Sequence, residues 1–234
     1  MKNSKDYYNN LSESYDSETI KRLKYLNKVD DYIIQNCQGN LINNYLDVGS
    51  GDGRRSLKIA DKVNVNNTIF LVDNSESMSS NIKENDRVKV CNISVNDLET
   101  ELKFDLITCL WNVLGHFPDK ESIMCFFKKV DSFLSNEGIF VFDVNNRYNI
   151  AQYGNKNVAR NIEKDILQEK GSGWFTLGDV PNQTQVYIHS PFDINFYLKS
   201  TNLYIEETLF IDYNTGGEVN TFFEGQLLYK LKKK

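Results

Sequence analysis

The stretch Leu-Asp-Val-Gly-Ser-Gly-Asp-Gly at residues 46–53 constrains the fold more than any other part of the chain. Glycines alternate at Gly49, Gly51 and Gly53 directly after a short apolar run, and Asp73 ends the next apolar run, 20 residues past Gly53. This spacing predicts a strand, a tight turn, a helix and a second strand that ends in a carboxylate. Such a unit suits a ligand that carries a nucleoside, because glycine lets the backbone approach closely and a carboxylate can accept from both ribose hydroxyls.

The spacing of the glycines and the acid before them indicate which kind of nucleoside fits. Dinucleotide sites use Gly-x-Gly-x-x-Gly and place a pyrophosphate at the N-terminus of the next helix. This chain has Gly-x-Gly-x-Gly, with Asp47 two residues before the first glycine. A carboxylate would repel a pyrophosphate but attract an ammonium or sulfonium. The pattern therefore favours a cationic nucleoside over a dinucleotide.

Strands and helices alternate through the first two thirds of the chain, and the strand cores are apolar on both faces. That is typical of a parallel sheet covered by helices, and it predicts a Rossmann-like, doubly wound α/β fold in one domain. The predicted helices cover residues 17–36, 53–62, 75–82 and 119–134, and the predicted strands cover 45–48, 69–73, 87–91, 106–111 and 139–144.

The last third of the chain has a different pattern. Residues 147–173 are polar and are predicted to begin with helix, and short strands are predicted at 174–177 and 185–188. A helix from Ser190-Pro191 to about Ser200 follows, because proline is favoured at the first helical position. The turn Asn214–Gly217 predicts an antiparallel hairpin between strands 204–212 and 222–230.

Four stretches together resemble the class I S-adenosylmethionine-dependent methyltransferases: LDVGSGDG (46–53), FLVDNSESM (70–78), FDLITCLWNVLGHF (104–117) and LSNEGIFVFDV (134–144). The resemblance covers about residues 40–145. It implies a seven-stranded sheet whose last strand is antiparallel. It also implies N-terminal lid helices (1–38), a cofactor-binding core (40–146), an insertion that caps the substrate (147–189) and a C-terminal helix and hairpin (190–234).

The resemblance implies S-adenosylmethionine as the cofactor and S-adenosylhomocysteine as the product. The family often has an acid after the third strand that binds the adenine amino group, and this chain has CNISVNDL (91–98) instead. Asn92, Ser94 or Asp97 would then serve, and we expect Asn92 with the Ile93 backbone. The implied cofactor-binding residues are Asp47, Gly49, Gly51, Gly53, Asp73, Asn74, Met78, Asn92, Ile93 and Leu110.

His116 is the first candidate for a catalytic base, because imidazole titrates near neutral pH and the residue follows the predicted fourth strand. Its loop resembles that of glycine and aminosugar N-methyltransferases; the alternative is a histidine that packs against or caps the next helix. Tyr15 is the second candidate, because LSESYDS (11–17) resembles the family's lid over the cofactor methyl group. Tyr7 and Tyr8 are weaker candidates for the same role.

Substrate contacts are expected from Trp111, Asn112, Asn145 and Arg147, which follow the predicted fourth and fifth strands. An arginine at that position could pair with a carboxylate or phosphate of the substrate. Trp111 could equally pack in the core or against adenine. His189 precedes a helix and could cap it or line the pocket.

Composition narrows the function further. The net charge is −5, and the basic cluster at residues 230–234 is expected to be a solvated terminus, so nucleic acid is not an expected partner. Four cysteines show neither a C-x-x-C pair nor metal-ligand spacing, so no metal is expected. No signal peptide or membrane span is evident, which predicts a cytoplasmic protein without a membrane partner, either monomeric or homodimeric.

These observations predict an enzyme that methylates a nitrogen, or an oxygen, of a small polar metabolite. The main alternative is an RNA or protein methyltransferase that uses residues 147–189 for recognition. A nicotinamide oxidoreductase is disfavoured by the glycine spacing and Asp47, and a catalytically idle cofactor-binding module is disfavoured by Tyr15 and His116.

Overall fold

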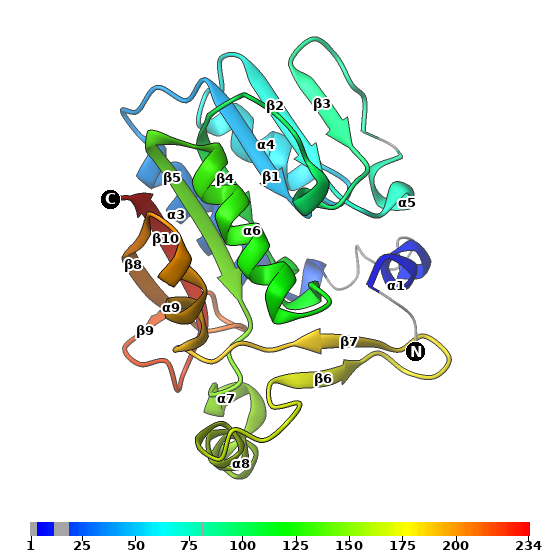
Figure 1. Ribbon diagram of the computed structural model, residues 1–234, viewed down its shortest axis with the longest axis vertical. Coiled ribbons are helices and arrows are strands. Elements are labelled where there is room, and N and C mark those ends of the chain that lie inside the picture. Colours follow the sequence, from blue (N-terminus) through cyan, green and yellow to red (C-terminus); the bar gives the residue numbers. More distant parts are fainter. Residues whose placement is uncertain (1–3, 12–18, 81) are drawn as a thin grey trace.

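A computed structural model describes residues 4–11, 19–80 and 82–234. An eight-stranded sheet in the order β3-β2-β1-β4-β5-β10-β8-β9 forms its centre (Figure 1). The pairs among β3, β2, β1, β4 and β5 are parallel, and β10 runs antiparallel to both of its neighbours. The strands are β1 Asn44–Val48, β2 Thr68–Val72, β3 Val88–Cys91, β4 Phe104–Cys109, β5 Leu134–Val144, β8 Leu203–Ile211, β9 Glu218–Val219 and β10 Gln226–Lys233.

Helices cover both faces of this sheet, as the alternating pattern predicted. In Figure 1, α6 (Lys120–Phe133) crosses the front of the sheet, and α3 (Leu23–Cys37) and α4 (Arg54–Lys62) lie behind it. On the front face α9 (Asp193–Tyr197) and the 3-10 turn η3 (Leu198–Ser200) accompany α6. The Rossmann-like α/β architecture expected from the sequence is confirmed.

Each face of the sheet has its own hydrophobic core. Neighbouring strand residues alternate between the two cores: Leu46 packs with the α6 face, whereas Tyr45 packs with α3 and α4. Phe140 and Phe142 of β5 likewise join the first core, and Val141 between them joins the second. Burial on both sides explains why these strands are apolar runs and not alternating ones.

The predicted count of seven strands differs from the structure by one short strand. The turn at Asn214–Gly217 leads back into β9, which pairs with the end of β8. β10 begins only at Gln226 and lies on the other side of β8, between β8 and β5. The turn signal was therefore correct, but the strand that it joins to β8 is a two-residue edge strand.

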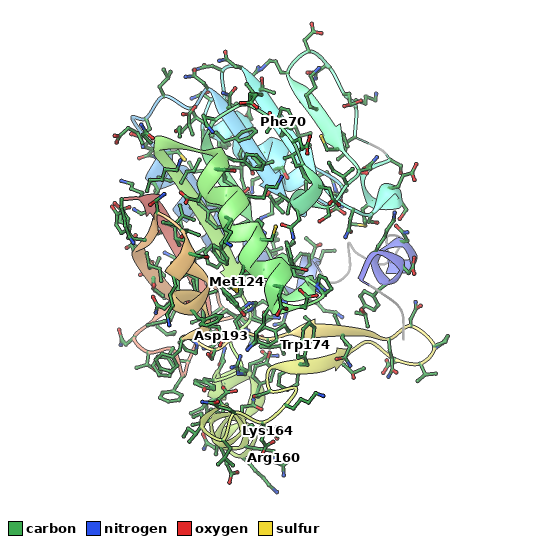
Figure 2. The ribbon with its side chains drawn as sticks, in the orientation of Figure 1. Phe70, Met124, Arg160, Lys164, Trp174 and Asp193 are labelled. Carbon is green, nitrogen blue, oxygen red and sulfur yellow. The ribbon has the colours of Figure 1, made fainter. Side chains whose placement is uncertain are left out.

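Residues 147–189 leave the sheet and return to it as a separate unit. They contain α7 (Ile150–Tyr153), α8 (Asn155–Ile166) and a hairpin of β6 (Trp174–Leu177) and β7 (Thr184–Tyr187). In Figure 1 the hairpin lies below the carboxyl ends of the parallel strands, and α1 (Ser4–Leu11) lies beside it. Figure 2 shows Arg160 and Lys164 on α8, at the end of the molecule remote from the sheet.

Three short elements complete the layer at the strand ends. They are α5 (Glu76–Ser79), which follows β2, the 3-10 turn η1 (Val95–Asp97), which follows β3, and the 3-10 turn η2 (Val113–His116), which follows β4. Each begins where a parallel strand has just ended, and this is the edge at which ligands bind in open α/β sheets. Within the described part of the chain, every helix is too short or too polar to span a lipid bilayer.

Candidate active site

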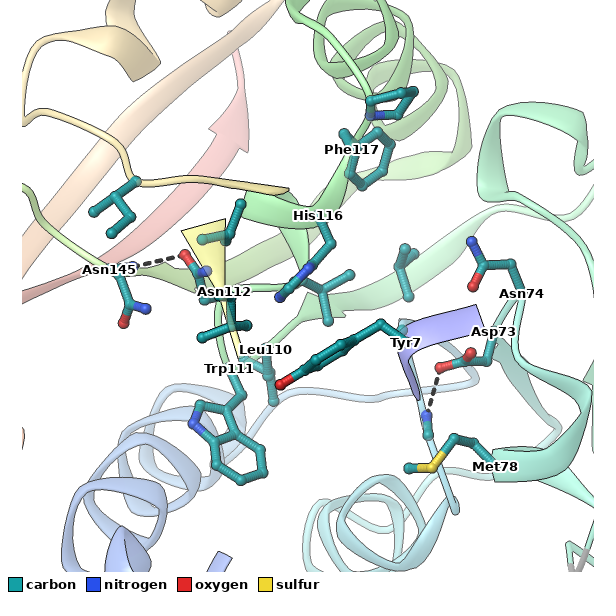
Figure 3. Close-up of a pocket in the computed structure, with 18 of the residues that line it drawn as sticks. Tyr7, Asp73, Asn74, Met78, Leu110, Trp111, Asn112, His116, Phe117 and Asn145 are labelled. Atoms are coloured by element: carbon teal, nitrogen blue, oxygen red, sulfur yellow. Dashed lines mark hydrogen bonds between the residues drawn. The ribbon is translucent and has the colours of Figure 1, made fainter. Parts of the chain in front are cut away.

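A cavity of about 740 Å³ opens at the carboxyl ends of the parallel strands (Figure 3). Its volume lies within the roughly 300–1,000 Å³ that is typical of small-molecule sites. One side, the strand-end half, is lined by Val48, Gly49, Gly51, Val72, Asp73, Asn74, Met78, Ile93, Ser94, Val95 and Leu110. The other side, the outer half, is lined by Tyr7, Trp111, Asn112, Val113, His116, Phe117, Pro118, Asn145, Gln152, Tyr153, Phe175, Thr176, Leu177, Gly178, Val186, Ile188, Tyr213 and Gln226.

The glycine turn after β1 brings bare backbone to the floor of the strand-end half. Gly49 has φ of 74°, in the left-handed region that favours glycine, and its amide donates to the Val72 carbonyl at 2.7 Å. A Cβ on Gly49 would overlap the side chain of Val113, which follows β4. The turn therefore holds the loops after β1 and β4 in contact.

Asp73 organises the opposite wall of the strand-end half. Its Oδ2 accepts from Gly51 N and its Oδ1 accepts from Ser75 N, each at 2.8 Å. Burial raises the pKa of this carboxyl, and the two backbone donors oppose that rise. Each oxygen keeps a second lone pair, so the carboxylate can still accept from two hydroxyls. Asn74 and Met78 lie beside it, as Figure 3 shows.

Three of the expected cofactor residues do not line the cavity. Asp47 is buried behind the glycine turn, where its carboxylate accepts from Ser56 Oγ and, at 2.5 Å, from Thr108 Oγ1. Burial raises its pKa to about 6. Gly53 is the residue before α4, where a Cβ would overlap Ile82, and the Asn92 amide oxygen accepts from Ser79 Oγ. Ile93 and Ser94 line the cavity instead of Asn92.

The loop after β4 is held in an unusual backbone conformation. Trp111 and Asn112 have φ of 61° and 60°, a region that residues other than glycine seldom adopt. Asp143 of β5 stabilises this turn: its Oδ1 accepts from Trp111 N at 2.6 Å, and its Oδ2 accepts from Tyr25 Oη at 2.7 Å. Backbone strain of this kind is common at functional sites.

Two further bonds fix the direction of the side chains on this loop. Asn145 N donates to Asn112 Oδ1 at 2.9 Å, and Trp111 Nε1 donates to Tyr213 Oη at 3.1 Å. Of the four expected substrate contacts, Trp111, Asn112 and Asn145 line the cavity, on the side where Figure 3 shows His116. The sequence placed them after two adjacent parallel strands, which end at the same edge of the sheet.

His116 lies at the end of η2 and lines the outer half of the cavity. Burial lowers the pKa of its imidazole to about 4. The ring is therefore neutral at pH 7 and able to accept a proton, although it is a weaker base than a solvated histidine.

Arg147 does not line the cavity. Its guanidinium donates to Asp165 Oδ2 at 2.8 Å, to Asp193 Oδ2 at 2.7 Å and to the Ile188 carbonyl at 2.8 Å, and the residue is 3% exposed. These bonds tie α8 and the segments at 188 and 193 to the end of β5. The two acids that pair with Arg147 are 18 and 46 residues away in sequence. The local sequence therefore gave no sign of this pairing, and the arginine was interpreted as an anion site.

His189, which the sequence left unassigned, is buried beside this cluster, and its ring lies 4.9 Å from that of Tyr187, edge to face. Neither of its ring nitrogens has a hydrogen-bond partner among the described residues. Burial lowers the pKa of the imidazole to about 4. It does not line the cavity.

At the N-terminus, Tyr15 lies outside the described residues. Tyr7, a weaker candidate from the sequence, lines the cavity, and in the view of Figure 3 its ring extends toward Leu110 and Trp111. α1 is tied to α5 because Ser75 Oγ and Ser77 Oγ both donate to Asn9 Oδ1, at 2.6 and 2.7 Å. Within the described residues, no group of three or more His, Cys, Asp or Glu side chains is arranged to hold a metal ion.

Several lining residues were not expected from the sequence. They come from the segment 147–189 and from the C-terminal strands, namely Gln152, Tyr153, Phe175, Val186, Ile188, Tyr213 and Gln226. The prediction that residues 147–189 form an insertion was the one signal that pointed toward the first five. Nothing in the local pattern marked Tyr213, which follows β8, or Gln226, which begins β10, since these strands reach the cavity only through sheet pairing.

Comparisons with known proteins agree with this geometry. A family model described as a methyltransferase domain matches residues 43–187, more than half of the chain. An uncharacterised protein of Methanocaldococcus jannaschii is 32% identical over 164 residues, which cover 68% of this chain. The match spans 57% of that relative's length.

Solved structures share the fold along most of the chain. A S-adenosylmethionine-dependent methyltransferase from Clostridium acetobutylicum has a TM-score of 0.66 at 23% identity, with 97% of this chain and 98% of that chain covered. The 1,6-didemethyltoxoflavin-N1-methyltransferase of Burkholderia thailandensis has a TM-score of 0.65 at 13% identity, with 97% and 85% covered. At these identities the likeness establishes a common fold.

Proposed function

The chain belongs to the methyltransferase domain family, and we propose that it transfers the methyl group of S-adenosylmethionine to a nitrogen, or an oxygen, of a small molecule. The observation that carries this proposal is a single cavity with two unlike halves. The strand-end half presents glycine backbone and the Asp73 carboxylate. The outer half continues from it without a break and contains a neutral imidazole.

The residues of the strand-end half fit a nucleoside bearing a sulfonium. Gly49 and Gly51 leave room for close backbone contact, and Asp73 is placed to accept from ribose hydroxyls. Ile93, Ser94 and Leu110 would contact the base. Behind these lining residues lie Asp47, Gly53 and Asn92, which would stabilise the conformation of the loops. S-adenosylmethionine, when bound, supplies an activated methyl group.

The outer half would bind and orient the acceptor. Trp111, Asn112 and Asn145 line it next to His116. An imidazole nitrogen of His116 would accept the proton that the acceptor N–H or O–H loses as its lone pair attacks. The wall from 147–189 would exclude water, which would otherwise compete for the activated methyl group. The Burkholderia thailandensis enzyme, which shares the fold, was crystallised with 1,6-didemethyltoxoflavin and S-adenosylhomocysteine both bound.

A small acceptor is favoured over RNA by charge. Among the described residues no lysine or arginine lines the cavity, and the whole chain carries 32 acidic against 27 basic residues. Phosphate groups would therefore meet no cation at the reaction site. The exposed Arg160 lies on α8, away from the strand ends (Figure 2).

Calorimetric titration with S-adenosylhomocysteine tests the cofactor assignment directly. Binding with a Kd in the micromolar range, together with transfer of a radiolabelled methyl group to a compound from a metabolite extract, is the expected result. Absence of S-adenosylhomocysteine binding by folded protein would refute the proposal, and binding of NADH in its place would assign the chain to a different reaction.

A further inference from the structure

The outer half of the cavity contains no permanently charged side chain among the described residues. Of the lining residues that the structure describes, Asp73 alone carries a formal charge, and it belongs to the strand-end half. The cations nearby already have partners: Arg147 is paired with Asp165 and Asp193, and Arg22 packs against the Tyr213 ring and donates to Asn214. His116 is neutral because burial lowers its pKa to about 4. A charged acceptor would lose its hydration in this half and find no ion to replace it.

Aromatic rings make up much of this wall. Tyr7, Trp111, Phe117, Tyr153, Phe175 and Tyr213 all line it. They come from α1, the loops after β4 and β8, α7 and β6, so they surround the space from several sides; Figure 3 shows the rings of Tyr7, Trp111 and Phe117. Aromatic walls favour flat ligands, because rings stack offset or edge to face against one another.

One buried donor in the wall lacks a partner. Gln226, the first residue of β10, is 1% exposed and lines the cavity. Its Oε1 accepts from Asn146 N at 2.7 Å, which fixes the orientation of the amide, and its Nε2 has no partner among the described residues. A buried amide donor without an acceptor costs free energy, and a small movement of the Gln226 side chain would let a ligand atom in the cavity supply that acceptor.

On these observations, and resting on the proposed methyl transfer, we infer that the acceptor is an uncharged, flat heteroaromatic molecule. Its ring carbonyl or ring nitrogen accepts a hydrogen bond from Gln226 Nε2. The aromatic side chains stack against the faces of its ring. Amino acids, sugar phosphates and other ionised metabolites are excluded because the wall offers no charge to replace their hydration. Gln226 is thereby a specificity-determining residue, and it lies outside every motif that carries the family resemblance.

A matched pair of compounds tests the class of acceptor. 4-Quinolone is flat and uncharged and has a ring carbonyl, and kynurenate is the same ring system with an added carboxylate. We expect protein saturated with S-adenosylhomocysteine to bind 4-quinolone about tenfold or more tightly than kynurenate at pH 8, measured by calorimetry. Equal or tighter binding of kynurenate, glycine or glucosamine 6-phosphate would overturn the inference, as would failure of 4-quinolone, lumazine and theophylline all to bind.

Substitution of Gln226 tests the hydrogen bond. Gln226→Leu removes the donor, and Gln226→Glu keeps an oxygen for Asn146 N while it replaces Nε2 with a second oxygen. Each variant should weaken 4-quinolone binding about tenfold and leave S-adenosylhomocysteine binding unchanged. Gln185→Leu, on the exposed side of β7, is the control and should change neither affinity.

Binding of S-adenosylhomocysteine tests the proposed methyl transfer, and binding of 4-quinolone tests the inferred acceptor class. If unmodified protein fails to bind S-adenosylhomocysteine, the methyltransferase assignment falls and the acceptor class falls with it. If S-adenosylhomocysteine binds and both Gln226 variants still bind 4-quinolone at full affinity, the role of Gln226 alone is overturned. Thermal melting of each variant confirms that the comparison is made between folded proteins.

Discussion

The two halves of the cavity are built in different ways. The strand-end half consists of residues that lie in or near the sequence stretches that carry the family resemblance. Its main contacts connect the loops after neighbouring strands, as the hydrogen bond from Gly51 N to Asp73 does. The outer half is assembled from α1, the loop after β4, the segment 147–189 and two C-terminal strands. The first half uses backbone and a single carboxylate, whereas the second uses rings and amides. Such a division is expected when the cofactor is common to a whole family and the acceptor differs from one enzyme to the next.

The largest expected effect is in the strand-end half. Asp73→Ala removes the acceptor of both Gly51 N and Ser75 N and the expected ribose contact. S-adenosylhomocysteine affinity should fall at least about 1,000-fold, or about 4 kcal/mol, in calorimetric titration. Gly51→Val should have a comparable effect, because Gly51 adopts φ of 55° and a Cβ would press on Met78. Asp61→Ala, exposed on α4, is the control, and retained affinity in Asp73→Ala would contradict the assignment.

The next effect concerns how the outer half is anchored. Arg147→Ala leaves Asp165 and Asp193 without their cation, and breaking a buried pair by removing one partner costs about 3 kcal/mol or more. The free energy of unfolding, measured by denaturant titration, should fall by about that amount, whereas the exposed Arg160→Ala should change it by less than about 0.5 kcal/mol. S-adenosylhomocysteine affinity of the folded variant should be retained. Unchanged stability with a raised KM for the acceptor would instead place Arg147 at the substrate.

Sequence reasoning succeeded where spacing alone fixes geometry. The alternating glycines and Asp73 are tied together by one strand–turn–helix–strand unit, so their meeting followed from the pattern. Trp111, Asn112 and Asn145 line the cavity together because adjacent parallel strands end at the same edge.

The failures arose where distant segments decide the outcome. Arg147 looked free to bind an anion until Asp165 and Asp193 reached it, and Gln226 lines the cavity only because β10 pairs with β5 in one particular register. The two-residue strand β9 is too short for any periodicity to show. Such features depend on tertiary packing and cannot be recovered from local pattern.

A smaller effect is expected at His116, in the outer half. His116→Ala should lower kcat about 100-fold, the range typical of losing a general base, with S-adenosylhomocysteine affinity changed less than about twofold. Because burial holds the His116 pKa at about 4, the unmodified enzyme should show no inflection near pH 6.5 in its kcat profile. The measurement is steady-state transfer of radiolabelled methyl groups from pH 5 to 9. An unaltered kcat in the variant would make His116 a packing residue.

The smallest effect concerns His189, buried behind the outer half. Its imidazole has a pKa of about 4 in the folded protein and about 6.5 in an unfolded chain, so the unfolded state binds more protons between these values. Stability is therefore present above pH 6.5 and is lost as the pH falls toward 4. From pH 7 to pH 5 this one residue should cost about 2 kcal/mol of unfolding free energy. His189→Phe, which keeps a ring against Tyr187, should abolish that part of the loss.

The difference between the two proteins isolates this contribution from the other titrating groups. The pKa of Asp47 is raised to about 6, so its contribution to the free energy of unfolding falls as the pH rises, opposite to that of His189. The contribution of His116 falls as the pH is lowered, like that of His189. Both are common to the unmodified protein and His189→Phe, so they cancel when the two denaturant titrations are subtracted at each pH. Parallel curves for the two proteins between pH 5 and 7 would mean that the pKa of His189 in the fold equals its unfolded value, with the nearby Asp193 carboxylate offsetting the effect of burial.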